Sequence, residues 1–301
     1  LQRAYFMNTD GTPTIASYRI KGVSTGDENP VLIVPFGDVH HDSPAHCRKK
    51  WQEFLTWAKR QDPARTVFLG MGDYMDGHSA SERSLLSSRV LHDSTTVRMA
   101  DEATERLDAF ASDIEFMRGR LIGMLSGNHY VELPGGIHGD RYLAGKLGAS
   151  FLGCFSMIRL LLHPYARSNR VLSVDIAAHH GIGGGKTPTG CMKSVEDMAR
   201  MIEADIYLMG HNHARGVGSG NTRLYLESAP STPTGLVMKS RDTILGRTGS
   251  FLKSYELGMP SYVVDSCMPP ASLGWIWFEL SILRLSRKDD RRETFSIRAI
   301  Q

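Results

Sequence analysis

The 301-residue chain has few cysteines and no paired ones. Its four cysteines, Cys47, Cys154, Cys191 and Cys267, lie far apart and form no Cys-x-x-Cys pair. This spacing argues against a disulfide framework and against a thiolate zinc site, and it favours a reducing compartment. We therefore expect a cytoplasmic protein.

The sequence also lacks a long apolar run. No stretch approaches the ~20 residues of a membrane span, and the N-terminal LQRAYFMNTDG contains no apolar signal core. The formal net charge is only +3, which by itself is too weak to indicate nucleic-acid binding. We expect a globular protein without a membrane partner.

Apolar runs alternate with helical patterns from residue 31 onward. The runs VLIVPFG, TVFLGMG, LIGMLSG and VLSVDIAAHH are typical of strands buried on both faces, and IYLMG is a shorter example. The segments between them carry apolar residues at helical spacing, so the sequence predicts an α/β architecture. Residues 1–30 are interpreted as an N-terminal extension or strand, and residues 31–301 as a single domain with a helical insertion near 77–118.

Later segments give further expectations. LYLES, SYVVDS and WIWFEL are predicted to be strands, and SVEDMARMIEA is predicted to be a helix capped by Ser194. The C-terminal LRLSRKDDRRETFSIRA mixes both charge signs and is interpreted as a solvated edge strand.

Asp, Asn and His residues follow each of five apolar runs. The motifs GDVHHD, GDYMDG, GNHY, HHG and GHNH supply Asp38 and His40, Asp73 and Asp76, Asn128 and His129, His179 and His180, and His211 and His213. Ligands of open α/β sheets bind at the carboxyl ends of the strands. We therefore expect these side chains to converge on one point.

The residue types indicate a two-metal site. Carboxylate, amide oxygen and imidazole ligands suit Mn, Fe, Zn, Co or Ni, and one carboxylate can bridge two cations. Residues two apart at a strand end, such as His211 and His213, can point the same way. A glycine before each pair permits a sharp turn.

The ordered series GDxH, GDxxD, GNH, HG and GHxH resembles the calcineurin-like metallophosphoesterase superfamily. The resemblance implies two mixed β-sheets packed as a sandwich and flanked by helices, with residues 31–301 as one catalytic domain. It also implies two divalent transition metal ions and seven ligands: Asp38, His40 and His213 for one metal, Asn128, His180 and His211 for the other, and Asp73 bridging them.

The same resemblance implies a reaction. A metal-bridging hydroxide would hydrolyse a phosphate ester, in particular a phosphodiester, and His129 would act as general acid. His180 is preferred to His179 as ligand because the family's ligand precedes the glycine. A metal-dependent DNA nuclease of the same superfamily and a non-catalytic scaffold that keeps the fold are the alternatives. Nucleic acid as substrate, the native metal (manganese among others) and the oligomeric state are left open.

Tyr130 departs from the family pattern, in which an acid commonly follows GNH and orients the catalytic histidine. Asp42, Asp76 or Glu132 could take this role, and the sequence does not choose among them. The Ser/Thr protein phosphatase branch is disfavoured because Gly77 and Ser126 stand where its phosphate-gripping arginines would be.

The loop GIGGGKTPTG resembles a P-loop, but its spacing is one residue short and Pro188 is expected to delay the following helix. Two interpretations remain: a glycine loop beside the metals from which Lys186 reaches a phosphate, or a plain surface loop. Asp76, Tyr130 and Lys186 are therefore candidates for supporting the ligands or for contacting the substrate.

Overall fold

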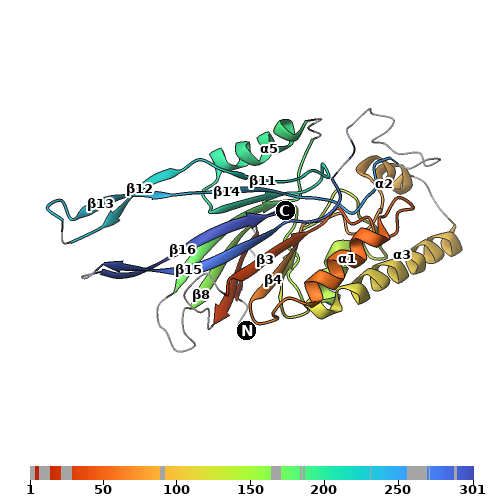
Figure 1. Ribbon diagram of the computed structural model, residues 1–301. Helices are drawn as coiled ribbons and strands as arrows, with labels where there is room; N and C mark the ends of the chain where they lie inside the picture. Colours follow the sequence, from red (N-terminus) through yellow and green to blue (C-terminus); the bar gives the residue numbers. More distant parts are fainter. Residues whose placement is uncertain are drawn as a thin grey trace.

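Two mixed β-sheets pack face to face and carry helices on both outer sides (Figure 1). The computed structural model describes residues 4–6, 14–21, 29–88, 92–163, 171–183, 185, 187–230, 232–255, 270, 272–287 and 290–301. The helices are α1 (Arg48–Lys59), α2 (Ala80–Ser87), α3 (Asp93–Asp113), the 3₁₀ turn η1 (Glu115–Met117), α4 (Gly139–Lys146) and α5 (Pro188–Met201). This arrangement confirms the predicted sandwich flanked by helices.

The larger sheet has seven strands in the order β1-β2-β8-β9-β10-β14-β11. They are β1 (Ala4–Phe6), β2 (Thr14–Lys21), β8 (Phe155–His163), β9 (Leu172–His179), β10 (Ile206–Met209), β14 (Ile244–Thr248) and β11 (Arg215–Ser219). Strands β9, β10 and β14 run parallel to one another. Their carboxyl ends therefore lie at the same edge of this sheet.

The smaller sheet has five strands in the order β16-β15-β3-β4-β5. They are β16 (Asp290–Ile300), β15 (Trp277–Arg287), β3 (Val31–Phe36), β4 (Thr66–Gly70) and β5 (Leu121–Met124). Strands β3, β4 and β5 are parallel, so their carboxyl ends also share an edge. Two hairpins complete the described strands: β6 (Glu132–Leu133) with β7 (Ile137–His138), and β12 (Arg223–Ser228) with β13 (Leu236–Arg241), which projects from the body (Figure 1).

Strand β3 shows why the smaller sheet lies in the middle of the layers. Its side chains alternate, as in any strand: Val31 and Ile33 pack into the core between the sheets, while Val34 and Phe36 pack under the helices. Helices α1, α3 and α4 cover that outer face, and α5 covers part of the other sheet. A strand buried on both faces needs the continuous apolar run seen in the sequence.

Several sequence expectations need correction. The helix expected to start at a Ser194 cap begins at Pro188, with the Thr187 side chain accepting from Gly190 N. Proline is favoured at the first helical position, where its missing N–H would have no intrahelical partner. The N-terminal region contributes two strands, β1 and β2, and the C-terminal segment forms the outer part of the β15–β16 hairpin, with β16 at the sheet edge.

The expected strand SYVVDS lies outside the described residues. Among the helices that are described, none is long and apolar enough to cross a membrane.

Candidate metal centre

The turns that follow β3, β4, β5, β9 and β10 meet between the two sheets. Main-chain bonds join the first two turns, since Val39 N donates to Asp73 O at 2.8 Å. Side chains join the others: His211 N donates to Asp38 Oδ2 at 2.9 Å, and His180 Nε2 lies 2.9 Å from Asn128 Oδ1. The five strand ends therefore converge as the sequence predicts.

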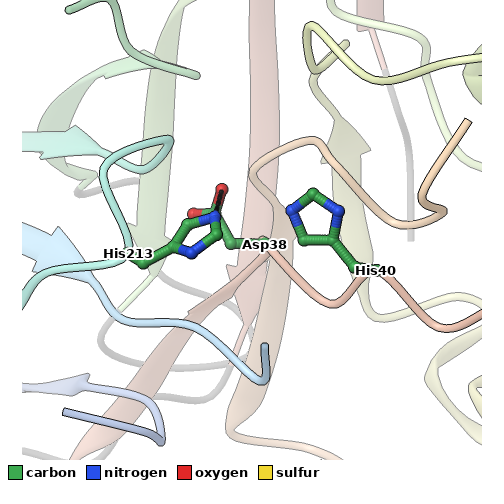
Figure 2. A group of neighbouring side chains, drawn as sticks. All are labelled: Asp38, His40 and His213. Carbon is green, nitrogen blue, oxygen red and sulfur yellow. Dashed lines mark ion pairs between the residues drawn. The ribbon is translucent and has the colours of Figure 1, made fainter. Parts of the chain in front are cut away.

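Asp38, His40 and His213 form the first group of potential ligands. One ligand atom of each lies within 4.8 Å of the others, and His213 Nε2 is 3.7 Å from Asp38 Oδ1. Figure 2 shows these three side chains beside one another, with Asp38 and His40 on the turn after β3 and His213 on the turn after β10. Asp38 and His40 are buried, and His213 is partly buried.

Asp73, His180 and His211 form the second group, again with one ligand atom each within 4.8 Å. Asn128 joins it, because its Oδ1 lies 2.9 Å from His180 Nε2 and 2.7 Å from His211 Nδ1. Asp73 Oδ2 is 3.3 Å from His180 Nε2 and 3.8 Å from His40 Nε2. This carboxylate therefore lies between the two groups, at the position that a bridging ligand needs.

The second group places two acceptor oxygens around the Nε2 atom of His180. His180 Nδ1 lies 2.8 Å from the carbonyl of Met71, which can only accept, so Nδ1 carries the hydrogen. His180 Nε2 faces Asn128 Oδ1 and Asp73 Oδ2, which both accept, so a proton on Nε2 meets these oxygens. A metal cation can take the place of that proton, and these donor types suit a divalent transition metal.

His40 gives the same indication in the first group. Its Nδ1 is 3.0 Å from Asp76 Oδ1, whereas its buried Nε2 has no hydrogen-bond partner. Histidine ligands of metals usually donate their other nitrogen to a carboxylate or carbonyl, which fixes the ring. The residues present therefore fit metal ions in both groups.

The pKa values of the histidines agree with this assignment. Burial lowers the pKa of His211 to about 4 and that of His213 to about 3, so both rings are neutral and can act as ligands. Burial also favours neutral His180, but the hydrogen bond and the charge of Asp73 outweigh it and raise the pKa of His180 to about 9. The negative potential that favours a proton there favours a metal cation in the same way.

Backbone conformation singles out the same residues. In the part of the chain that the structure describes, five non-glycine residues have positive φ: Asp38 (47°), His40 (45°), Asp73 (48°), His211 (72°) and His213 (56°). This region costs side-chain-bearing residues of order 1–3 kcal/mol each and is concentrated at functional sites. All five belong to the ligand set expected from the sequence.

Two glycines of the motifs leave room for the carboxylates of the centre. A Cβ at Gly127 would lie 1.9 Å from Asp73 Oδ1, and one at Gly210 would lie 2.8 Å from Asp38 Oδ2. Any other residue would displace a carboxylate of the centre. The sequence argument expected sharp turns at these glycines, whereas Gly127 and Gly210 are required by close approach.

His129 lies at the rim of the centre. Its N–H donates to Asp73 Oδ1 at 2.8 Å, and its buried Nδ1 has no hydrogen-bond partner but is 3.9 Å from Asp76 Oδ1. Of the acids considered for orienting His129, Asp76 is thus the one placed beside it. Asp42 instead accepts from Asp76 N at 2.5 Å, and Glu132 pairs with His138 in the β6–β7 hairpin.

The other two candidates for supporting the ligands lie elsewhere. Tyr130 turns its ring onto His138, 3.7 Å away between ring centroids. Lys186 lies outside the described residues.

Arg247 is a residue of the site that sequence reasoning missed. It is 1% exposed, and it donates from Nη1 to Gly210 O at 2.8 Å and from Nε to Cys191 O at 2.7 Å. It therefore fixes the turn before His211 against helix α5. Its partners are main-chain carbonyls, which any segment offers, so no sequence motif marks it.

Comparisons with known proteins give no family. No family model and no curated protein matches the chain. Among solved structures, a single mutant of Vps29 from Entamoeba histolytica matches with a TM-score of 0.34 and 12% identity, over 90% of this chain and 99% of that one. A likeness of this degree supports no inference about function.

The two adjacent histidines before Gly181 give a test of the ligand set. His180 is 2% exposed and faces Asn128, whereas His179 Nδ1 accepts from Gly181 N at 2.8 Å. We expect His180→Ala to empty the second metal position and His179→Ala to leave both positions occupied. Anomalous-scattering maps of manganese-soaked crystals measure this, and loss of metal from the His179 variant alone would reverse the assignment.

Proposed function

We propose that this protein hydrolyses phosphate esters, specifically phosphodiesters, with two divalent metal ions as cofactors. The observation that carries the proposal is the pair of ligand groups, each with one ligand atom per residue within 4.8 Å of the others, and the Asp73 carboxylate that lies between them. The motif order along the chain supports the same conclusion, because it resembles that of the metallophosphoesterases.

The protein residues divide into ligands and a proton donor. Asp38, His40 and His213 would hold one ion, and Asn128, His180 and His211 would hold the other. Bound metal ions would lower the pKa of a water toward ~7 and offset the charge of the phosphoryl oxygens.

His129 is the proton donor of this proposal. It comes from the same turn as Asn128, and its ring lies beside His40, at 5.3 Å between ring centroids, and beside Asp76. Burial lowers the pKa of His129, and the charges of Asp73 and Asp76 offset only part of that shift. As general acid, its protonated ring would donate to the leaving oxygen.

The strained ligand turns favour an enzyme over a scaffold. A protein that kept only the fold would gain stability by relaxing the five positive-φ positions to glycine or by changing the turns. This chain keeps a ligand-type side chain at each of them.

Metal content tests the proposal directly. We expect about two manganese ions per chain after incubation and dialysis, because two groups of imidazole and carboxylate ligands are present. Elemental analysis measures the ratio. A chain that retains none after manganese loading would contradict the proposal, and a ratio of one would contradict the second ligand group.

A substrate panel with the metal-loaded protein tests the reaction. The panel compares bis-p-nitrophenyl phosphate, p-nitrophenyl phosphate, cyclic nucleotides and single- and double-stranded DNA. Hydrolysis of the diesters over the monoester would support the proposal. Activity confined to DNA would favour the nuclease alternative, and no activity with bound metal would favour a scaffold.

A further inference from the structure

Three side chains stack beside the Asn128–His129 turn. The guanidinium carbon of Arg83, on α2, lies 3.6 Å from the centroid of the Tyr130 ring. On its other side Tyr130 stacks on His138, at 3.7 Å between centroids and an interplanar angle of 19°. Tyr130 is the residue that departs from the family pattern, so the stack occupies the position next to the ligand turn where an acid is expected.

The stack also holds the main chain of that turn at both ends. Arg83 Nη1 donates to Asn128 O at 3.0 Å and to His78 O, and His78 N donates to Tyr130 O at 3.2 Å. At the other end, His138 Nε2 lies 2.9 Å from Ser126 Oγ. Arg83, His78 and His138 therefore hold the main chain and Ser126 side chain of residues 126–130 from outside the metal centre. None of the three belongs to the proposed ligands.

We infer that Arg83 is a positioning residue, which acts through Tyr130 and through Asn128 O to fix the ligand Asn128 and the proton donor His129. Its consequence for catalysis rests on the proposed function, whereas its effect on the turn does not. A planar guanidinium can stack on a ring and donate at its edge simultaneously, which a lysine ammonium cannot. Partners of metal ligands contribute roughly 10–100-fold to metal affinity or activity.

Helix α2 makes Arg83 a suitable position for substitution. The helix has eight residues and begins with a capping box in which Ser79 and Glu82 bond each other. It lies outside the three core clusters, and Glu82, Ser84 and Leu85 are exposed. Replacing Arg83 therefore removes no core packing, and we expect the variants to fold.

The first test needs neither metal nor substrate. Amide hydrogen exchange of residues 125–131 is measured in metal-free wild type, Arg83→Met, Arg83→Lys and Tyr130→Phe, with Arg98→Met, an exposed arginine of α3, as matched control. We expect exchange at least tenfold faster in Arg83→Met, a smaller increase in Arg83→Lys, and wild-type exchange in Tyr130→Phe and Arg98→Met. Unchanged exchange in Arg83→Met overturns the inference.

The second test measures the consequence at the centre. Manganese affinity in Arg83→Met should fall about 10–100-fold at the position that Asn128 occupies and stay unchanged at the other, as seen by anomalous scattering. The kcat for a phosphodiester should fall by a similar factor with KM unchanged, and millimolar guanidinium should restore part of it. A raised KM with unchanged metal affinity and exchange would instead mean that Arg83 contacts substrate, which overturns the positioning role.

The two proposals fail in different ways. If wild type binds no manganese and hydrolyses nothing while Arg83→Met still speeds exchange of the turn, the proposed function falls and the positioning role stands. If wild type is an active manganese enzyme and Arg83→Met changes neither exchange nor manganese affinity, the proposed function stands and the positioning role falls.

Discussion

Asp73→Asn should remove metal from both positions and abolish measurable turnover on every substrate. The substitution keeps the shape of the side chain and an oxygen that can accept from His129 N, but it removes the charge shared by the two groups. Losing a residue that only supports a metal ligand lowers metal affinity about 10–100-fold. Losing the charge of a bridging carboxylate should therefore lower metal affinity more than about 100-fold. All substrates should slow alike, because the loss precedes the choice of leaving group.

Thermal unfolding provides a readout of this variant without any substrate. A metal that binds only the folded chain stabilises it by about 2.7 kcal/mol at 100 times its dissociation constant. Manganese should therefore raise the melting temperature of the wild type and leave that of Asp73→Asn nearly unchanged. Retention of two ions, or an undiminished shift, would show that Asp73 does not bridge.

Asp140→Asn is the matched control, since both carboxyls are buried close to the GNH turn. Asp140 Oδ2 accepts from Gly127 N at 3.1 Å, and burial raises its pKa to about 8. Asp140 is therefore largely neutral at pH 7, and an amide can replace it with little change in charge. We expect this variant to keep both metal ions, so that the loss in Asp73→Asn reflects the bridging charge and not a buried Asp-to-Asn change as such.

The turns of the candidate metal centre could be located from the sequence because two signals coincide there. A continuous apolar run predicts a buried strand, and a polar motif directly after it lies at the strand's carboxyl end. The strands themselves are shorter than the apolar runs predict, since β3 ends at Phe36, β4 at Gly70 and β5 at Met124. The positive φ of Asp38 and Asp73 takes the chain out of the extended conformation just beyond the first two of these ends.

The surroundings of the turns could not be predicted. Arg83 and Arg247 reach carbonyls 45 and 37 residues away, and a carbonyl carries no residue identity that a motif could record. The role of Tyr130 could not be predicted from the sequence either. The sequence marked it as a missing acid, but its role depends on an arginine and a histidine that only the fold brings to its two faces.

His129→Ala should keep both metal ions and lose rate, with a loss that depends on the leaving group. His129 meets Asp73 through its main-chain N–H, which alanine retains, and its side chain is not needed to complete either group of the proposed ligands. General acid catalysis typically contributes ~10²–10⁴-fold. A loss of this size is expected for a diester with an alkoxide or nucleoside leaving group, which departs poorly without a proton.

The leaving group supplies the internal control for this variant. A p-nitrophenolate needs little protonation to depart, so the loss of rate on bis-p-nitrophenyl phosphate should be much smaller than on an alkyl diester.

A general acid must be protonated to act, so the wild-type rate should fall as pH rises through the pKa of His129 in the enzyme–substrate complex. This alkaline limb of the pH–rate profile should vanish in His129→Ala. His179→Ala, which removes a neighbouring imidazole whose Nδ1 bonds only the Gly181 amide in the described structure, should keep both the rate and the limb. Undiminished turnover of an alkyl diester by His129→Ala would assign the proton transfer to another group, and an equal loss on both diesters would place His129 in binding rather than in acid catalysis.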